Sequence, residues 1–154
     1  YQQAMKWLLG SLANATLDSV AIIVPVVLIA GIIVARNTNA LNILSLGNQP
    51  SQLLGLSPKT FVIKIYITAC MLTSIIVSFT GSIGFVGLVI PHICRIYTGT
   101  DNRVLLPVVI LVGALFLLIA DFVARIVLFP VELPVGAVTA LLGAPLFIYL
   151  LRRT

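Results

Sequence analysis

The chain has 154 residues and a net charge of +5, with 60% hydrophobic and only 8% charged residues. Soluble domains carry roughly a quarter charged residues, so this composition excludes an ordinary soluble enzyme and indicates a membrane protein. The nine Lys and Arg residues lie scattered between long apolar runs, so we interpret their charge as a topology signal and expect no nucleic-acid partner.

Five apolar stretches are candidate membrane spans, because a hydrocarbon core about 30 Å thick needs roughly 20 residues of helix. The uncharged stretch 65–94 is too long for one span and too short for two, so the sequence TGSIG must hold a break. We therefore predict an all-α fold, a polytopic transmembrane helical bundle, preceded by an external segment at residues 1–15. The predicted spans are residues 16–36, 59–80, 84–98, 104–128 and 135–151.

The positive-inside rule orients these spans in the membrane. A cytoplasmic C-terminus leaves only Lys6 and Arg125 on the external face. The cytoplasmic face then receives Arg36, Lys59, Lys64, Arg95, Arg103, Arg152 and Arg153. We expect a multi-pass protein of the cell (inner or cytoplasmic) membrane with its C-terminus in the cytoplasm. Because the chain starts at Tyr1 without a signal-peptide pattern, we also expect a fragment of a longer protein.

Residues 40–58 are too polar for a span and form the predicted cytoplasmic loop. Gly47 can end one short helix, Asn48 or Gln49 followed by Pro50 can start a second, and Gly55 can end that one. Several leucines give the loop an apolar side. This pattern favours a contact with another protein, and the alternative is an interfacial helix lying on lipid.

The stretch GSIGFVG contains Gly81, Gly84 and Gly87, which could suggest a phosphate-binding loop. Their G-x-x-G-x-x-G spacing matches neither the dinucleotide fingerprint nor the P-loop, and no basic residue follows within reach. We therefore predict that the glycines allow close packing at a helix break, and that Pro91 bends or ends the first part of the next helix.

His92 and Cys94 are the next candidates for chemistry, but they are two residues apart and face different sides of a helix. No second histidine or carboxylate lies at helical spacing, so we assign no metal site, no cofactor and no catalytic residue. We expect Cys70 and Cys94 to be buried apolar residues. A competing hypothesis is an intramembrane metallohydrolase that uses His92 and Asp121. The predicted spans place His92 near the inner face of the membrane and Asp121 toward the outer face, so these two side chains should not meet.

Asp121 and Arg125 are four residues apart on the fourth span, so they can pair on one helix face. Charges inside spans are costly and usually functional. The sequence leaves two interpretations open, a self-neutralised structural pair and an outward-facing docking group. Glu132, in the external turn FPVELP, can join the pair or remain a solvated loop charge.

Small residues recur every fourth position on the last span, at Gly136, Ala140 and Ala144, with Gly143 beside them. Such a stripe permits close helix approach. Packing within one subunit and a role at a pore or dimer seam both remain open.

In chain order, several motifs resemble the permease subunits of ABC importers for iron-siderophores, haem and vitamin B12, the FecCD family. They are KWLLGSL, LNILSLGNQPSQLLGLSP, SFTGSIGFVGLVIPHICRI, TDNRVLLP, LIADFVARI and ELPVGAVTALLGAPLFIYLLRR. The resemblance implies the C-terminal half of a ten-helix permease, whose partners are ABC ATPase subunits, a substrate-binding protein and a second permease copy. The implied cargo is an iron chelate or a corrinoid.

The resemblance also assigns roles to residues. Arg125, with Glu132, would dock the binding protein, and the last span, with Gly136, Ala140, Gly143 and Ala144, would line the pathway or dimer seam. The cytoplasmic loop would dock on the ATPase through Leu44, Leu46, Gly47, Gln52, Leu53, Leu54, Gly55 and Leu56. Asn48 and Gln49 stand where relatives often carry an acidic residue. A membrane scaffold without transport activity is a third hypothesis.

Overall fold

The computed structural model describes residues 9–12, 15–127 and 133–153, with residues 151 and 153 described by their backbone only. Regular structure in these parts is helical throughout, which confirms the all-α prediction. The helices are α2 (Leu17–Arg36), α3 (Thr38–Leu44), α4 (Asn48–Leu53), α5 (Pro58–Thr80), α6 (Val86–Thr98), α7 (Asn102–Ile126) and α8 (Val135–Arg153).

Within the described residues, α2, α5 and α7 are long and apolar enough to cross a membrane, whereas α6 and the Val135–Leu150 part of α8 are shorter apolar helices. The bounds of these five helices differ from those of the predicted spans mainly at the first residue of the helix. A single residue, Asn37, separates the end of α2 from the start of the first loop helix, α3. Helix α7 begins at Asn102 because Asp101 caps its N-terminus.

Local chemistry explains where the first long helix begins. Thr16 and Ser19 form a capping box, in which the Ser19 backbone N–H donates to Thr16 Oγ1 at 3.3 Å and the Thr16 N–H donates to Ser19 Oγ at 3.0 Å. At the other end, the Asn37 side chain donates to the Ile33 carbonyl at 2.6 Å, which ends the helix and lets α3 start in a new direction.

The break between α5 and α6 falls at the predicted TGSIG stretch and extends to Phe85. Gly81 ends α5 with φ 71°, and Phe85, not Gly84, adopts the second left-handed conformation with φ 65°. Gly87 and Pro91 lie inside α6. A Cβ at Gly84 or Gly87 would meet nothing within 4 Å among the described residues, so no described part of this chain packs closely against these two glycines.

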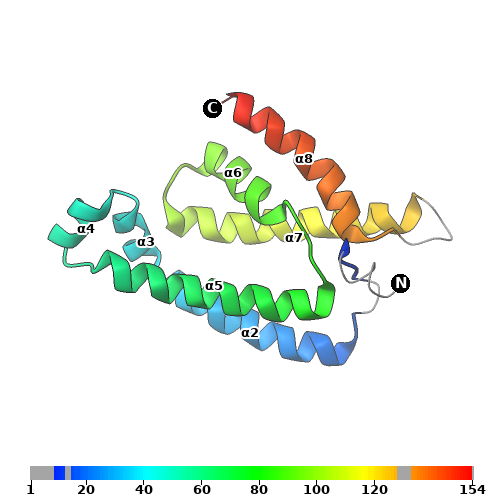
Figure 1. Ribbon diagram of the computed structural model, residues 1–154, viewed down its shortest axis with the longest axis horizontal. Coiled ribbons are helices and arrows are strands. Elements are labelled where there is room, and N and C mark those ends of the chain that lie inside the picture. Colours follow the sequence, from blue (N-terminus) through cyan, green and yellow to red (C-terminus); the bar gives the residue numbers. More distant parts are fainter. Residues whose placement is uncertain (1–8, 13–14, 128–132, 154) are drawn as a thin grey trace.

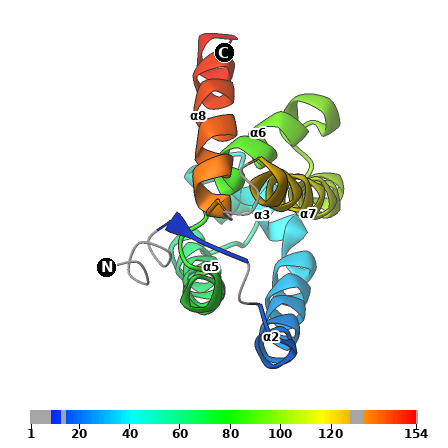
Figure 2. The ribbon, with the colours of Figure 1, turned by 90° about the vertical axis from the view of Figure 1, so that its right-hand side faces the viewer.

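The helices form two groups (Figures 1 and 2). One group is the antiparallel pair α2 and α5, and the other contains α6, α7 and α8. Two apolar clusters hold the second group together. Ala120, Ala124, Val135 and Val138 join α7 to α8, and Ile90, Cys94 and Leu105 join α6 to α7. Cys94 is therefore buried as predicted, whereas Cys70 on α5 is exposed, contrary to the prediction.

Both ends of the molecule connect the two groups. At one end, α3 and α4 lie where α2 ends and where α5 and α7 begin (Figure 1). At the other, the Ser11 N–H donates to the Thr80 carbonyl at 2.8 Å and the Gly136 N–H donates to the Gly10 carbonyl at 3.4 Å. The segment before α2 thus ties the end of α5 to the start of α8.

Candidate functional site: the α3–α4 loop and its connections

The α3–α4 loop is one compact unit built around Ser51. This side chain is fully buried, and its Oγ lies 3.0 Å from the Ile43 carbonyl and 2.5 Å from the Gly47 carbonyl. The Leu56 N–H donates a hydrogen bond to the Ser51 carbonyl at 3.0 Å. These bonds join both short helices and the chain leaving them, so the loop is one hydrogen-bonded unit.

Three leucines at the tip of this loop face away from the rest of the chain. Leu46 is 63% exposed, Leu53 89% and Leu54 61%. Gly47, Gln52 and Gly55 are also exposed, while Leu44 and Leu56 are partly buried. Several exposed leucines on one short loop are typical of a surface that another molecule covers.

A polar cluster that the sequence analysis missed fastens α3 to the start of α7. Asn42 Nδ2 donates to Asp101 Oδ1 at 2.7 Å, and Asn42 Oδ1 accepts from the backbone N–H and side-chain amide of Asn102 at 2.9 and 2.8 Å. Arg103 Nε donates to Asn39 Oδ1 at 2.6 Å. We call these five residues the Asn42 cluster.

Asp101 is the charged acceptor of this cluster. Its carboxylate accepts the backbone N–H of Arg103 at 3.0 Å, and this hydrogen bond, followed by the one from Asn42, lowers the pKa of Asp101 below its usual value of 3.8. The carboxylate therefore stays ionised at neutral pH and can accept both hydrogen bonds.

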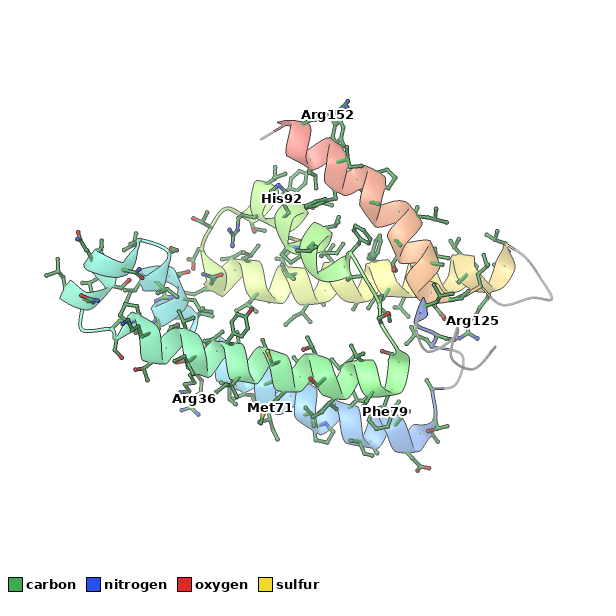
Figure 3. All side chains as sticks on the ribbon, in the orientation of Figure 1. Arg36, Met71, Phe79, His92, Arg125 and Arg152 are labelled. Carbon is green, nitrogen blue, oxygen red and sulfur yellow. The ribbon has the colours of Figure 1, made fainter. Side chains whose placement is uncertain are left out.

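Arg125 and Asp121 lie toward the opposite end of α7 and form an ion pair. Arg125 Nε lies 2.9 Å from Asp121 Oδ2, and the two side chains are 48% and 23% exposed. Figure 3 places Arg125 near the end of α7 where the segment before α2 passes. The pair is therefore formed and still accessible. Glu132, the other predicted docking residue, lies outside the described residues.

The small residues of α8 divide into two kinds. Gly136 and Gly143 are buried against this chain: a Cβ at Gly136 would meet the Leu9 carbonyl oxygen, and one at Gly143 would meet the Phe85 side chain. Ala140 and Ala144 are only partly buried. The two glycines thus pack within this chain, whereas the two alanines are partly exposed.

His92 lines an open groove between α6 and α8 together with Arg95, Tyr97, Leu146 and Tyr149. In Figure 3 it lies on α6, well apart from Arg125, to which Asp121 is hydrogen-bonded. Among the described residues, no three His, Cys, Asp or Glu side chains are grouped so that they could hold a metal ion. The geometry therefore offers no support for a hydrolase that uses His92 with Asp121.

Comparison with known proteins places this architecture among transport permeases. The chain is 42% identical over 97% of its length to the cobalamin import system permease protein BtuC of Halobacterium salinarum, of which it covers 40%. It is 39% identical over 96% of its length to the Fe(3+) dicitrate transport system permease protein FecC of Escherichia coli, of which it covers 44%. The chain thus spans less than half of these relatives.

A solved structure and a family model agree with these relatives. The structure, described as a metal-chelate type ABC transporter in an inward-facing conformation, superposes with a TM-score of 0.93 at 33% identity, covering 99% of this chain and 49% of that one. The model of the FecCD transport family matches residues 1–153. The resemblance found in the sequence is thereby confirmed, and the chain belongs to the FecCD transport family.

Proposed function

We propose that this chain is part of the permease of a binding-protein-dependent ABC importer that moves an iron chelate, haem or a corrinoid across the cell membrane. The observation that carries the proposal is the exposed leucine surface of the α3–α4 loop, formed by Leu46, Leu53 and Leu54. A separate ATPase subunit is the natural occupant of this surface in an importer. The named cargoes of the two relatives, cobalamin and Fe(3+) dicitrate, support the cargo class.

In this proposal, ATP hydrolysis by a separate subunit supplies the energy for transport. The sequence contains no G-x-x-x-x-G-K-[ST] motif, so the ATPase partner hydrolyses ATP. Closure of two ATPase subunits displaces the α3–α4 loop, which is continuous with α2 on one side and α5 on the other. The displacement then tilts these helices and opens or closes the path for the cargo.

The remaining surfaces take the other partners. Arg125 docks the substrate-binding protein on the external side, with Glu132 as its neighbour in sequence. Ala140 and Ala144 keep a partly exposed face that suits the pathway or the seam with a second permease copy. The basic residues Arg36, Lys59 and Arg103 belong to the end of the molecule that carries α3 and α4, which supports a cytoplasmic location for that end.

Truncation of the exposed leucines tests the proposal directly. In the complete permease, Leu53→Ala and Leu54→Ala should each weaken binding of the ATPase subunit by about ten-fold or more, because each buried leucine contributes about 1.5–3 kcal/mol. Leu118→Ala is the matched control: Leu118 is 69% exposed on α7, within a predicted span, and its truncation should leave the affinity unchanged. Binding is measured by titrating purified ATPase subunit onto the permease in detergent, and wild-type affinity in both loop variants would refute the docking surface.

A further inference from the structure

We infer that Asn42 is a positioning residue for energy coupling, because its hydrogen bonds make the α3–α4 loop and α7 move as one body. The inference rests on the proposed importer function. It adds a connection between the loop and α7, through which a displacement of the loop can reach a helix that does not adjoin the loop in sequence. The loop is covalently continuous with α2 and α5, whereas Asn42 and Asp101 are 59 residues apart in sequence. The Asn42 cluster is thus a side-chain connection between the loop and the second group of helices.

The geometry of Asn42 uses both ends of its amide. The Nδ2 donates to the Asp101 carboxylate at 2.7 Å, while Oδ1 accepts two hydrogen bonds from Asn102. One turn earlier on the same face of α3, Asn39 accepts from Arg103 at 2.6 Å. A contact made at two successive turns resists both rotation and sliding of α3 against α7, which a single bond would not do.

The position of the cluster explains what it would transmit. Asp101 caps α7 through the Arg103 N–H, so a pull on Asn42 acts on the first turn of that helix. Ala120 and Ala124 on α7 pack on α8, and Leu105 near the start of α7 packs on α6. A displacement of the loop thereby reaches α6, α7 and α8, in addition to α2 and α5.

An exchange of two residues tests this role without changing the composition. The Asn42→Asp variant sets a second carboxylate against Asp101, removes the donor and should push α3 from α7. Combining Asn42→Asp with Asp101→Asn restores a donor and an acceptor in reversed order, and asparagine caps a helix as well as aspartate does. The double variant therefore has the composition of the wild type and should regain the contact.

The readout is the amount of cargo transported per ATP hydrolysed in proteoliposomes that contain the complete importer. The cargo is radiolabelled cyanocobalamin, ferric citrate or haemin, whichever the wild type transports. We expect Asn42→Asp to hydrolyse ATP but to lower this ratio several-fold, and the double variant to restore it. A wild-type ratio in Asn42→Asp, or a double variant as impaired as the single one, would overturn the inference.

A cross-link keeps the test decisive if Asn42→Asp does not assemble. In a Cys70→Ser background, which removes the exposed native thiol of this part of the permease, Asn42→Cys and Asn102→Cys break the cluster. A short bis-methanethiosulfonate then reconnects the two positions by forming a disulfide with each thiol and releasing methanesulfinate. The inference predicts a low ratio before cross-linking and a restored ratio afterwards; no gain on cross-linking contradicts it. If the wild type transports none of the three cargoes with ATP, the proposed function itself has failed, which separates the two outcomes.

Discussion

Arg125 illustrates how a charge can be satisfied within the chain and still be available to a partner. Its guanidinium reaches both carboxylate oxygens of Asp121, at 2.9 and 3.5 Å, while about half of its side chain is exposed. Exposed ion pairs contribute only about 0–1 kcal/mol. Exchanging Asp121 for a carboxylate on another protein would therefore cost little, so the structural and the docking interpretation of the pair are compatible.

We predict that Arg125→Glu in the complete permease weakens association with its substrate-binding protein by about ten-fold, or about 1.4 kcal/mol, at low salt. The effect should shrink as salt rises, because exposed charges are screened. Surface plasmon resonance with the permease in nanodiscs measures it. Arg36→Glu, a charge reversal in the last turn of α2 at the opposite end, serves as the control and should bind normally. Equal affinities for both variants would show that Arg125 does not take part in docking.

At the scale of elements, the α5–α6 break depends on a contact between Phe85 and α8. Phe85 is held at φ 65°, an unfavourable backbone conformation for a side chain of this size. The Cβ of Phe85, followed by the first ring carbon, occupies the space that a Cβ on Gly143 would need. The absent side chain on α8 therefore makes room for Phe85, and this contact fixes the angle at which α6 leaves the break.

We predict that Gly143→Ala destabilises the complete permease by about 1–3 kcal/mol, because the added methyl group overpacks this contact. Gly87→Ala is the matched control: its methyl group meets nothing within 4 Å among the described residues, and alanine favours a helix. The melting temperature of each variant is determined in a Cys70→Ser background, with labelling of the buried Cys94 thiol as the signal of unfolding. If the Gly143→Ala variant has the melting temperature of the wild type, the Phe85 contact accommodates the added methyl group without loss of stability, which contradicts the prediction.

Helix bounds follow from local sequence signals more closely than helix contacts do. Hydropathy together with Gly47 and Gly81 indicated where elements begin or end, because these signals act within one or two turns of the chain. Nothing local distinguishes Phe85 as the left-handed residue of the break. The Asn42 cluster was likewise missed, since its partners are about 60 residues away in sequence and polar residues in a loop are ordinarily interpreted as solvated.

At the scale of the whole molecule, two helix groups are joined at both ends and leave much apolar surface uncovered. Exposed leucines, isoleucines and valines run along α2, α5 and α7. The chain spans less than half of its relatives' length. In the proposed importer, lipid and neighbouring helices would cover this apolar surface. Under the proposed function, the α3–α4 loop is the part that receives force from the ATPase subunit.

Uptake into proteoliposomes tests the central claim, that the α3–α4 loop couples ATP hydrolysis to transport, most directly. The complete permease is reconstituted with its ATPase and substrate-binding protein, and the uptake of cyanocobalamin, ferric citrate or haemin is measured with and without ATP. The account predicts ATP-dependent uptake of at least one cargo by the wild type and loss of uptake in the Leu53→Ala, Leu54→Ala double variant. Uptake by that variant at the wild-type rate, or no ATP-dependent uptake by the wild type, would contradict it.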